Sequence, residues 1–170
     1  MFKVGIIGDE ASQDFQTVVD MAVEFNLDSI EVRSVWDKAP QELTDQDIDN
    51  MKQILEGTNV KIIGIASPFY KCDIDNTEER KEHINILKRC IKLAKAFDVN
   101  LIRTFVFWKI DNIEERWGEI VGSYDEPVRI AESEGITLGM ENEYSTNLAT
   151  AKLTERFIGE IDSPSVKAIW

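Results

Sequence analysis

The chain has 170 residues, of which 43% are hydrophobic and 30% are charged, and its formal net charge is −13 at pH 7. This length and apolar content predict a single globular domain with a core of its own. A surface this acidic repels phosphate backbones, so nucleic acid is not expected as a partner.

The sequence shows neither a membrane segment nor a disulfide pattern. No apolar run approaches the roughly 20 residues of a membrane helix, and the first residues lead into a strand rather than a signal peptide. Cys72 and Cys90 lie far apart without CxxC or zinc-ligand spacing, which predicts two reduced thiols. We therefore expect a cytoplasmic protein with no membrane partner.

A strand followed by a helix is predicted at the start of the chain. Residues 3–8 have the pattern of a buried strand and end in Gly8-Asp9-Glu10. The next helix is indicated by apolar residues at helical spacing, which are Phe15, Val18, Val19, Ala22 and Val23.

The second strand, over residues 29–33, carries charge on one face only. Ile30 and Val32 can pack on helices. Because side chains alternate along a strand, Glu31 and Arg33 face the other way.

Two further elements and the start of a third follow in the middle of the chain. A near capping box over residues 44–47 begins the second helix, and Gly57 ends it. Residues 60–66 form a third strand, almost wholly apolar as expected of a strand that is covered on both faces. The third helix begins near residues 75–77 and has acid in its first turn, where the helix dipole favours it.

The second half of the chain repeats this alternation. Residues 101–107 are predicted as a strand that contains Arg103, and one helix is predicted over 112–134, kinked or interrupted by Pro127. Residues 136–144 supply the fifth strand.

The last predicted elements are a helix and a strand. Thr146 or Asn147 is expected to cap the helix, with Leu153, Phe157 and Ile158 facing inward. A sixth strand is predicted over residues 166–170.

Regular alternation of strands and helices predicts an α/β fold with a parallel sheet, either a barrel or an open doubly wound sheet. The first strand lacks the GxGxxG spacing of a dinucleotide-binding loop, which disfavours the open sheet. Every strand is instead followed by polar or aromatic groups, as at a barrel mouth. These are Asp9, Glu10, Glu31, Arg33, Ser67, Lys71, Arg103, Trp108, Glu141 and Glu143.

Glu141 is the leading candidate among these groups. Alternation places Ile136, Leu138 and Met140 on one face of the fifth strand. The other face has Thr137, Gly139 and Glu141, so the carboxylate ends the strand beside small residues. Loops at that end of a parallel sheet gather groups around one ligand.

Five motifs give the chain a resemblance to a known family: GIIGDE, SIEVRSVW, IIGIASPFYK, LIRTFVFW and LGMENEYST. Together they resemble the xylose-isomerase-like TIM-barrel superfamily, in its sugar phosphate isomerase/epimerase branch, over essentially the whole chain. The resemblance implies that the glutamate ending strand five, Glu141, binds a divalent metal. In the family an aspartate after strand six, a histidine on strand seven and a glutamate on strand eight complete the site.

Only Glu141 has a counterpart in these 170 residues. A full barrel takes about 250 residues. The resemblance therefore implies an incomplete (β/α) barrel over residues 1–170, with about six parallel strands and five outer helices. Unpaired strand edges would favour a homo-oligomer.

The resemblance also implies a chemistry and a set of site residues. A divalent ion, Mn, Mg, Co or Zn, would hold the oxygens of a ketose-like carbohydrate while a proton moves through an enediolate. Glu141 would act as catalytic residue and metal ligand. The substrate-binding candidates are Glu31, Arg33, Lys71, Arg103 and Trp108.

Each candidate also has a structural interpretation. Glu141 can pair with Arg103, Glu31 can pair with Arg33, and Lys71 and Glu143 can be ordinary exposed loop residues. Asp9 and Glu10 can cap a helix. The aromatic residues Trp36, Tyr70 and Trp108 either stack on a sugar or pack in the core, and His83, in the third helix, is expected to be structural.

Two other functions are considered. An apurinic endonuclease-like phosphodiesterase would need several metal-binding histidines, which one helical histidine and a charge of −13 oppose. The other is a non-catalytic truncated barrel, or a subunit that needs a partner to complete its sheet.

Overall fold

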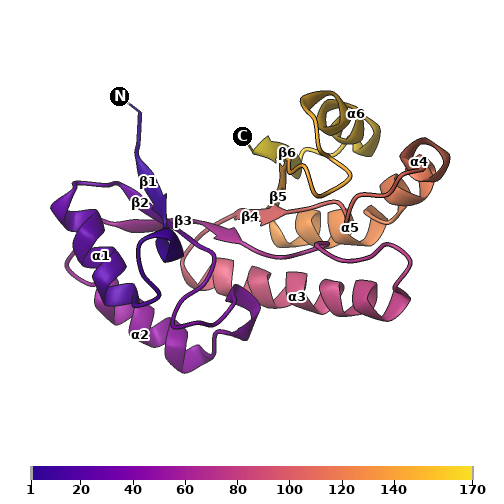
Figure 1. Cartoon of the computed structure of the whole chain (residues 1–170). Helices are drawn as coiled ribbons and strands as arrows, with labels where there is room; N and C mark the ends of the chain where they lie inside the picture. Colours follow the sequence, from indigo (N-terminus) through magenta and orange to yellow (C-terminus); the bar gives the residue numbers. More distant parts are fainter. Residues whose placement is uncertain (1, 170) are drawn as a thin grey trace.

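One six-stranded sheet organises the chain in the computed structural model, which describes residues 2–169 (Figure 1). All neighbouring strands are parallel and follow one another in chain order. A doubly wound sheet would reverse its strand order, so the sequential order identifies a partial TIM-type barrel, as predicted. The strands are β1 (Gly5–Ile7), β2 (Ser29–Val32), β3 (Lys61–Ala66), β4 (Leu101–Thr104), β5 (Thr137–Glu141) and β6 (Val166–Ile169).

Helices occupy each of the five connections between strands and follow the outside of the curved sheet (Figure 1). Their bounds are α1 (Phe15–Glu24), α2 (Asp45–Leu55), α3 (Thr77–Ala96), α4 (Ile113–Gly122), α5 (Asp125–Glu134) and α6 (Ala151–Ile161). Among the described residues, none of these helices is long and apolar enough to span a membrane.

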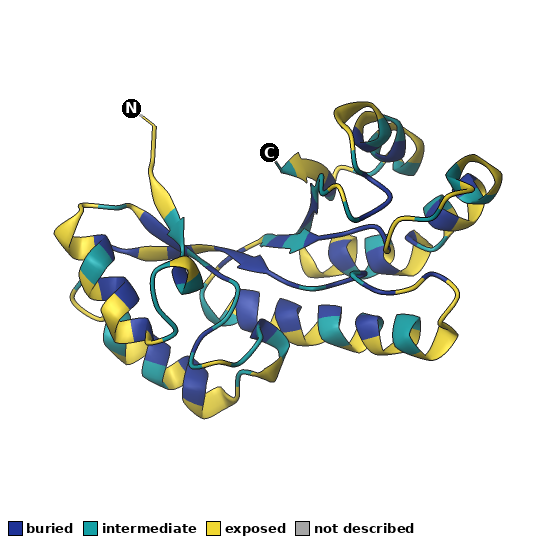
Figure 2. Ribbon diagram, in the orientation of Figure 1, coloured by how far each residue is buried: buried dark blue, intermediate teal, exposed yellow. Residues whose placement is uncertain are grey.

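The core lies between the sheet and these helices (Figure 2). Alternation places Ile30 and Val32 of β2 in it, and Leu138 and Met140 of β5 are completely buried there. This arrangement confirms the predicted faces of both strands. The opposite face of the sheet is the inside of the barrel.

Local sequence signals set the helix starts as predicted. Thr44 and Asp47 form the capping box of α2, with each side chain accepting the other residue's backbone N–H. Asn76 caps α3 in the same way by accepting the Glu79 N–H. Gly57, at φ +77°, takes the left-handed conformation just after α2.

Three predicted strands are shorter in the structure by more than one residue. The first covers Gly5–Ile7 and passes into a 3₁₀ turn over Gly8–Glu10, and β5 stops at Glu141 rather than at residue 144. The predicted strand 101–107 ends at Thr104. The cause is a change of partner, because the backbone beyond Thr104 bonds to the loop after β3 instead of to a strand.

The prediction that the third strand is covered on both faces is wrong. Ile63 is 51% exposed, because the register of β2 against β3 shifts between Ile30 and Glu31 and leaves Ile63 without a partner in β2. The inner face is also open, since β1 and β6 do not pair with each other within the described residues. Val23 of α1 is likewise 54% exposed rather than inward-facing.

The single helix predicted over 112–134 is two helices, α4 and α5, that separate at Ser123 and Tyr124. Pro127 explains the break, because it lacks the N–H that would bond the Ser123 carbonyl and its ring would clash with that carbonyl. The freed carbonyl accepts the Tyr70 hydroxyl at 3.1 Å instead.

The predicted caps of the last helix are wrong. Thr150 caps α6 by accepting the Leu153 N–H, while Thr146 and Asn147 are buried in the preceding loop. The sixth strand is confirmed over Val166–Ile169, and Trp170 lies outside the described residues.

Both cysteines are buried free thiols, as expected. Burial raises the pKa of each thiol to about 12, so neither is a reactive thiolate near neutral pH.

Candidate functional site

Charged side chains lie on the inner face of the sheet near the carboxyl ends of β2, β4 and β5. Small residues are their neighbours in the strand register. Gly64 lies opposite Glu31 in the strand register, and Arg103 lies between Ala66 of β3 and Gly139 of β5. An added Cβ at Gly139 would overlap the side chain of Ile169, so this position has no space for a larger residue.

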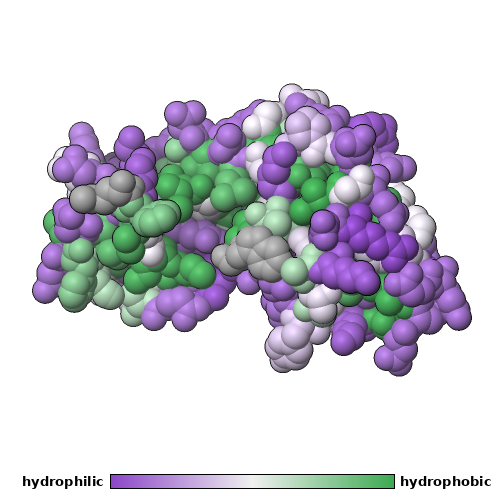
Figure 3. Space-filling view, turned by 90° about the horizontal axis from the view of Figure 1, so that it is seen from above, coloured by the Kyte–Doolittle hydropathy of each residue, from purple (hydrophilic) through white to green (hydrophobic). Residues whose placement is uncertain are grey.

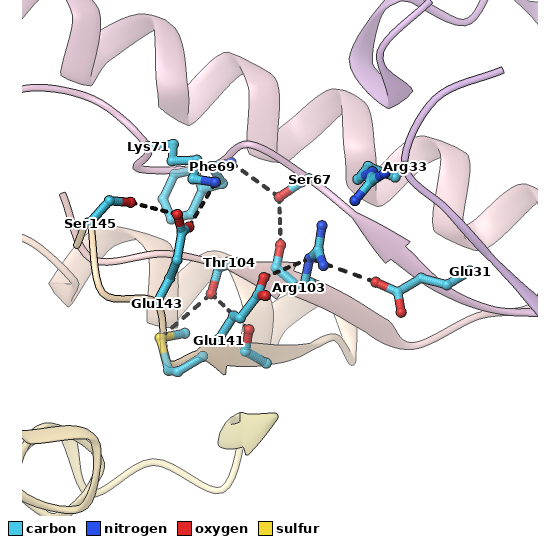
Figure 4. Close-up of polar contacts among 12 residues, drawn as sticks. Glu31, Arg33, Ser67, Phe69, Lys71, Arg103, Thr104, Glu141, Glu143 and Ser145 are labelled. Atoms are coloured by element: carbon cyan, nitrogen blue, oxygen red, sulfur yellow. Dashed lines mark hydrogen bonds and ion pairs between the residues drawn. The ribbon is translucent and has the colours of Figure 1, made fainter. Parts of the chain in front are cut away.

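Arg103 lies between two carboxylates (Figure 4). Its Nε is 3.1 Å from Glu141 Oε2 and 3.7 Å from Glu31 Oε1. The Arg103 side chain is only 11% exposed. The structural interpretation of Glu141 as a partner of Arg103 is therefore confirmed, and Arg103 joins the ends of three strands.

This cluster is incompletely satisfied. Arg103 Nε and Glu31 Oε1 are buried, and no hydrogen bond with proper geometry reaches either atom within the described chain. Burial raises the pKa of Glu31, the Glu141 charge raises it further, and Arg103 opposes both effects. One donor and one acceptor of the cluster therefore have no partner within the described chain, and Glu31 holds a proton more readily than an exposed glutamate does.

Arg33 does not belong to this cluster. Its guanidinium contacts Asp9 at 2.9 Å and Glu10 at 2.6 Å, and Figure 4 shows it apart from Arg103. The predicted pair between Glu31 and Arg33 is wrong, because the two side chains have different partners.

Asp9 and Glu10 do not cap a helix either. The N-cap of α1 is Asp14, which accepts the Thr17 N–H at 3.0 Å. The two acids bind Arg33 instead and tie the end of β1 to the end of β2.

Lys71 and Glu143 form a second pair at the mouth, between the loops after β3 and β5. Lys71 Nζ is 2.7 Å from Glu143 Oε2 and lies 4.3 Å from the centre of the Phe105 ring. Burial alone would raise the pKa of Glu143, but bonds from Lys71 and Ser145 hold that pKa below its ordinary value. The interpretation of these two residues as ordinary exposed loop side chains is wrong.

The three candidate aromatic residues have different environments. Tyr70 is buried and its ring stacks on Phe69 and Phe107, so it belongs to the core. Trp36 packs edge-on against Phe15. Trp108 is 41% exposed near Lys71, which leaves it free to contact a ligand.

His83 is structural, as expected. It is buried in α3, and its Nδ1 accepts the Tyr70 N–H at 2.8 Å. Burial lowers its pKa and so favours the neutral ring.

The described residues do not form a metal site by themselves. No three histidine, cysteine, aspartate or glutamate side chains within residues 2–169 lie close enough to share an ion. Glu141 contributes one carboxylate, already engaged by Arg103, so the residues present do not fit a metal without further ligands.

Comparison with known proteins agrees with this geometry. A family model described as xylose isomerase-like TIM barrel matches residues 19–170. The chain belongs to this family. No curated protein sequence matches the chain significantly.

Solved structures of the xylose isomerase-like fold resemble the chain over almost its full length. One is a probable 3-DHS dehydratase, AsbF, of Bacillus anthracis, with 20% identity and a TM-score of 0.78, covering 98% of this chain and 62% of its own. Another is the IOLI protein with a bound zinc atom, with 17% identity and a TM-score of 0.79, covering 97% and 61%.

A third is a D-psicose 3-epimerase crystallised in the presence of D-fructose, with 17% identity, a TM-score of 0.75, and coverage of 98% and 62%. At these identities the likeness shows the shared fold. The chain spans less than two thirds of the length of each of these three structures.

Proposed function

We propose that the chain provides part of the active site of a divalent-metal-dependent sugar isomerase or epimerase. The observation that supports this most is Arg103, which holds Glu31 and Glu141 together at the carboxyl ends of the strands, where barrels of this kind carry their chemistry. A carbohydrate-epimerase neighbour and a zinc-bound neighbour in the same fold are consistent with it.

Within this proposal Glu141 is a metal ligand and a proton-transferring carboxylate. Because the described residues do not fit a metal alone, the remaining ligands come from outside residues 2–169, either from a continuation of the chain or from a partner. Sequencing the gene beyond the Trp170 codon tests the first source, since a continuation would encode the aspartate, histidine and glutamate of the family.

The other residues of this chain bind and orient the substrate in the proposal. Arg103 sets the direction of both carboxylates, and Glu31, whose side chain is 26% exposed, accepts a hydrogen bond from a sugar hydroxyl. Trp108 offers an aromatic face to the apolar CH side of a sugar ring. Lys71 and Arg33 contact ligand oxygens at the rim.

Deuterium exchange tests the proposed reaction. The full-length protein, with any natural partner, is incubated with ketoses in heavy water that contains Mn²⁺. NMR then follows the incorporation of deuterium at the carbon beside the carbonyl. We expect metal-dependent incorporation that Glu141→Gln abolishes and Glu143→Gln leaves measurable. Incorporation that persists unchanged in Glu141→Gln contradicts the proposal, and release of water with an unsaturated product indicates a dehydratase instead.

A second candidate is a non-catalytic barrel that completes its sheet with another copy. The open edges of β1 and β6 favour it. An absence of deuterium incorporation, both with and without Mn²⁺, would support this candidate against the first. An endonuclease is disfavoured because a net charge of −13 opposes the approach of DNA.

A further inference from the structure

The loop between β3 and α3 has an unusual backbone at Tyr70. Its φ is +58°, a left-handed conformation that residues with side chains seldom adopt. Its carbonyl accepts the Phe107 N–H at 2.8 Å, which ties the loop to the segment after β4. Its own N–H points the other way, into the protein, where it donates to His83 Nδ1 at 2.8 Å.

Lys71, the next residue, reaches the mouth from this fixed point. Its N–H donates to the Pro68 carbonyl at 2.8 Å, closing a turn around Tyr70. Its Nζ then lies against Glu143 and above the Phe105 ring, as Figure 4 shows for the first contact. The direction of the Lys71 side chain therefore depends on the conformation of the Tyr70 peptide.

The side chain of Tyr70 is held by other contacts. Its hydroxyl donates to the Ser123 carbonyl, and its ring stacks between Phe69 and Phe107. These contacts secure the ring without setting the direction of the peptide N–H. Two contacts fix this direction: the Phe105 N–H donates to the Phe69 carbonyl of the same peptide at 3.0 Å, and His83 accepts the Tyr70 N–H at 2.8 Å.

We propose that His83 is a positioning residue for the mouth of the barrel. By accepting the Tyr70 N–H, it holds the left-handed turn that aims Lys71 at Glu143. This role is independent of the proposed reaction, because all the residues involved belong to this chain and the role can be tested without measuring catalysis.

The hydrogen bond requires a neutral imidazole. A protonated ring would place an N–H on Nδ1, opposite the Tyr70 N–H, and two donors cannot bond. Burial lowers the pKa of His83, while the charges of Glu79 and Glu82 on the same helix oppose the shift. From the loop, the titratable side chain that packs against the ring is Tyr70. The contribution of His83 to the turn is therefore present at neutral pH and lost in acid.

Two substitutions of His83 separate positioning from packing. His83→Leu removes the acceptor, whereas His83→Asn places an amide oxygen near the position of Nδ1 and cannot be protonated in this range. The reactivity of Lys71 toward acetic anhydride, measured by mass spectrometry relative to Lys61 and Lys88, reports whether it still lies against Glu143. Circular dichroism and the amide exchange of α3 show that each variant is folded.

We expect His83→Leu to raise the relative labelling of Lys71 roughly fivefold, the factor that corresponds to one net hydrogen bond. His83→Asn should restore the wild-type value. Lowering the pH from 7.5 to 5 should raise the relative labelling in the wild type and not in His83→Asn. In a Glu143→Gln background, His83→Leu should add nothing, because the contact through which it acts is already lost.

Unchanged labelling in a folded His83→Leu variant would overturn the proposal. So would His83→Asn behaving like His83→Leu, or an equal effect of His83→Leu in the Glu143→Gln background. If His83→Leu does not fold, the comparison of wild type with His83→Asn across pH decides, and identical pH profiles refute the role.

Discussion

At the scale of single residues, Arg103 is the cation that balances the two carboxylates of the site, Glu31 and Glu141. It is nearly enclosed and lies within 3.7 Å of a carboxylate oxygen from each of two strands. Two carboxylates so placed repel each other unless a cation or a proton intervenes. In this chain the cation is Arg103, and an added metal ion would have to compete with it for Glu141.

Arg103→Met therefore should destabilise the fold, by about 2–3 kcal/mol at pH 7, because it leaves two carboxylates without their cation. The loss should shrink near pH 4. A glutamate whose folded-state pKa is raised, as that of Glu31 is, supports folding below its unfolded pKa and loses that support as the pH rises through the folded value. Urea unfolding at both pH values measures the difference.

Arg33→Met is the matched control, since the Arg33 side chain is 37% exposed and the Arg103 side chain only 11%. It should cost less than about 1 kcal/mol at either pH. Equal losses for the two variants would mean that Arg103 is an ordinary surface ion-pair residue.

At the scale of elements, the inner face of β5 is shaped by the absence of a side chain at Gly139. Its neighbours on that face are Leu101 of β4 and Ile169 of β6. The side chain of Ile169 occupies the space that a side chain at position 139 would need. Gly64 is different, since an added Cβ there would make only ordinary contacts, the nearest at 3.6 Å.

Gly139→Val should cost about 1–3 kcal/mol through overpacking against Ile169 and Leu101. Gly64→Ala should change the free energy of unfolding by less than about 1 kcal/mol. Thermal unfolding of the two variants compares them directly. A neutral Gly139→Val would show that β6 moves away from β5 at little cost.

The sequence predicted the elements that depend on local signals. Apolar periodicity located all six strands. The near capping box over residues 44–47 and the acidic first turn after residues 75–77 marked two helix starts. The failures arose where partners are distant in the sequence. β4 ends early because the loops after β3 and β4 form hydrogen bonds with each other. Thr150 caps α6 because the expected caps, Thr146 and Asn147, are buried in the loop before it.

The same division holds for the site. Face alternation placed Glu31 and Glu141 away from the packed faces of their strands, and the suggested pairing of Glu141 with Arg103 is confirmed. The pairs of Arg33 with Asp9 and of Lys71 with Glu143 join loops whose relative position follows from strand register. Alternation within one strand carries no information about that register, so these pairs could not be predicted.

At the scale of the whole molecule, the sheet is an open barrel with two unpaired edge strands in the described residues. Apolar side chains such as Val4 and Ile63 are exposed on or beside its inner face, and Figure 3 shows apolar patches on the side seen from above. Exposed edges and apolar patches favour association, whereas a net charge of −13 opposes the approach of a second copy.

We therefore expect self-association that increases with ionic strength, since salt screens the repulsion and leaves the apolar contact in place. Sedimentation velocity at about 20 mM and 500 mM NaCl tests this. Ile63→Lys should keep the protein monomeric at both salt concentrations. A particle of one chain under every condition would contradict the proposed homo-oligomer.

The central claim is that Glu141 is a metal ligand in the assembled site. Isothermal titration calorimetry of Mn²⁺ binding to the full-length protein, with any natural partner, tests the claim most directly. We expect Glu141→Gln to weaken binding by at least roughly tenfold, while Glu143→Gln leaves the affinity within about threefold of the wild type. An unchanged affinity in Glu141→Gln, or no binding by the wild type, would contradict the claim.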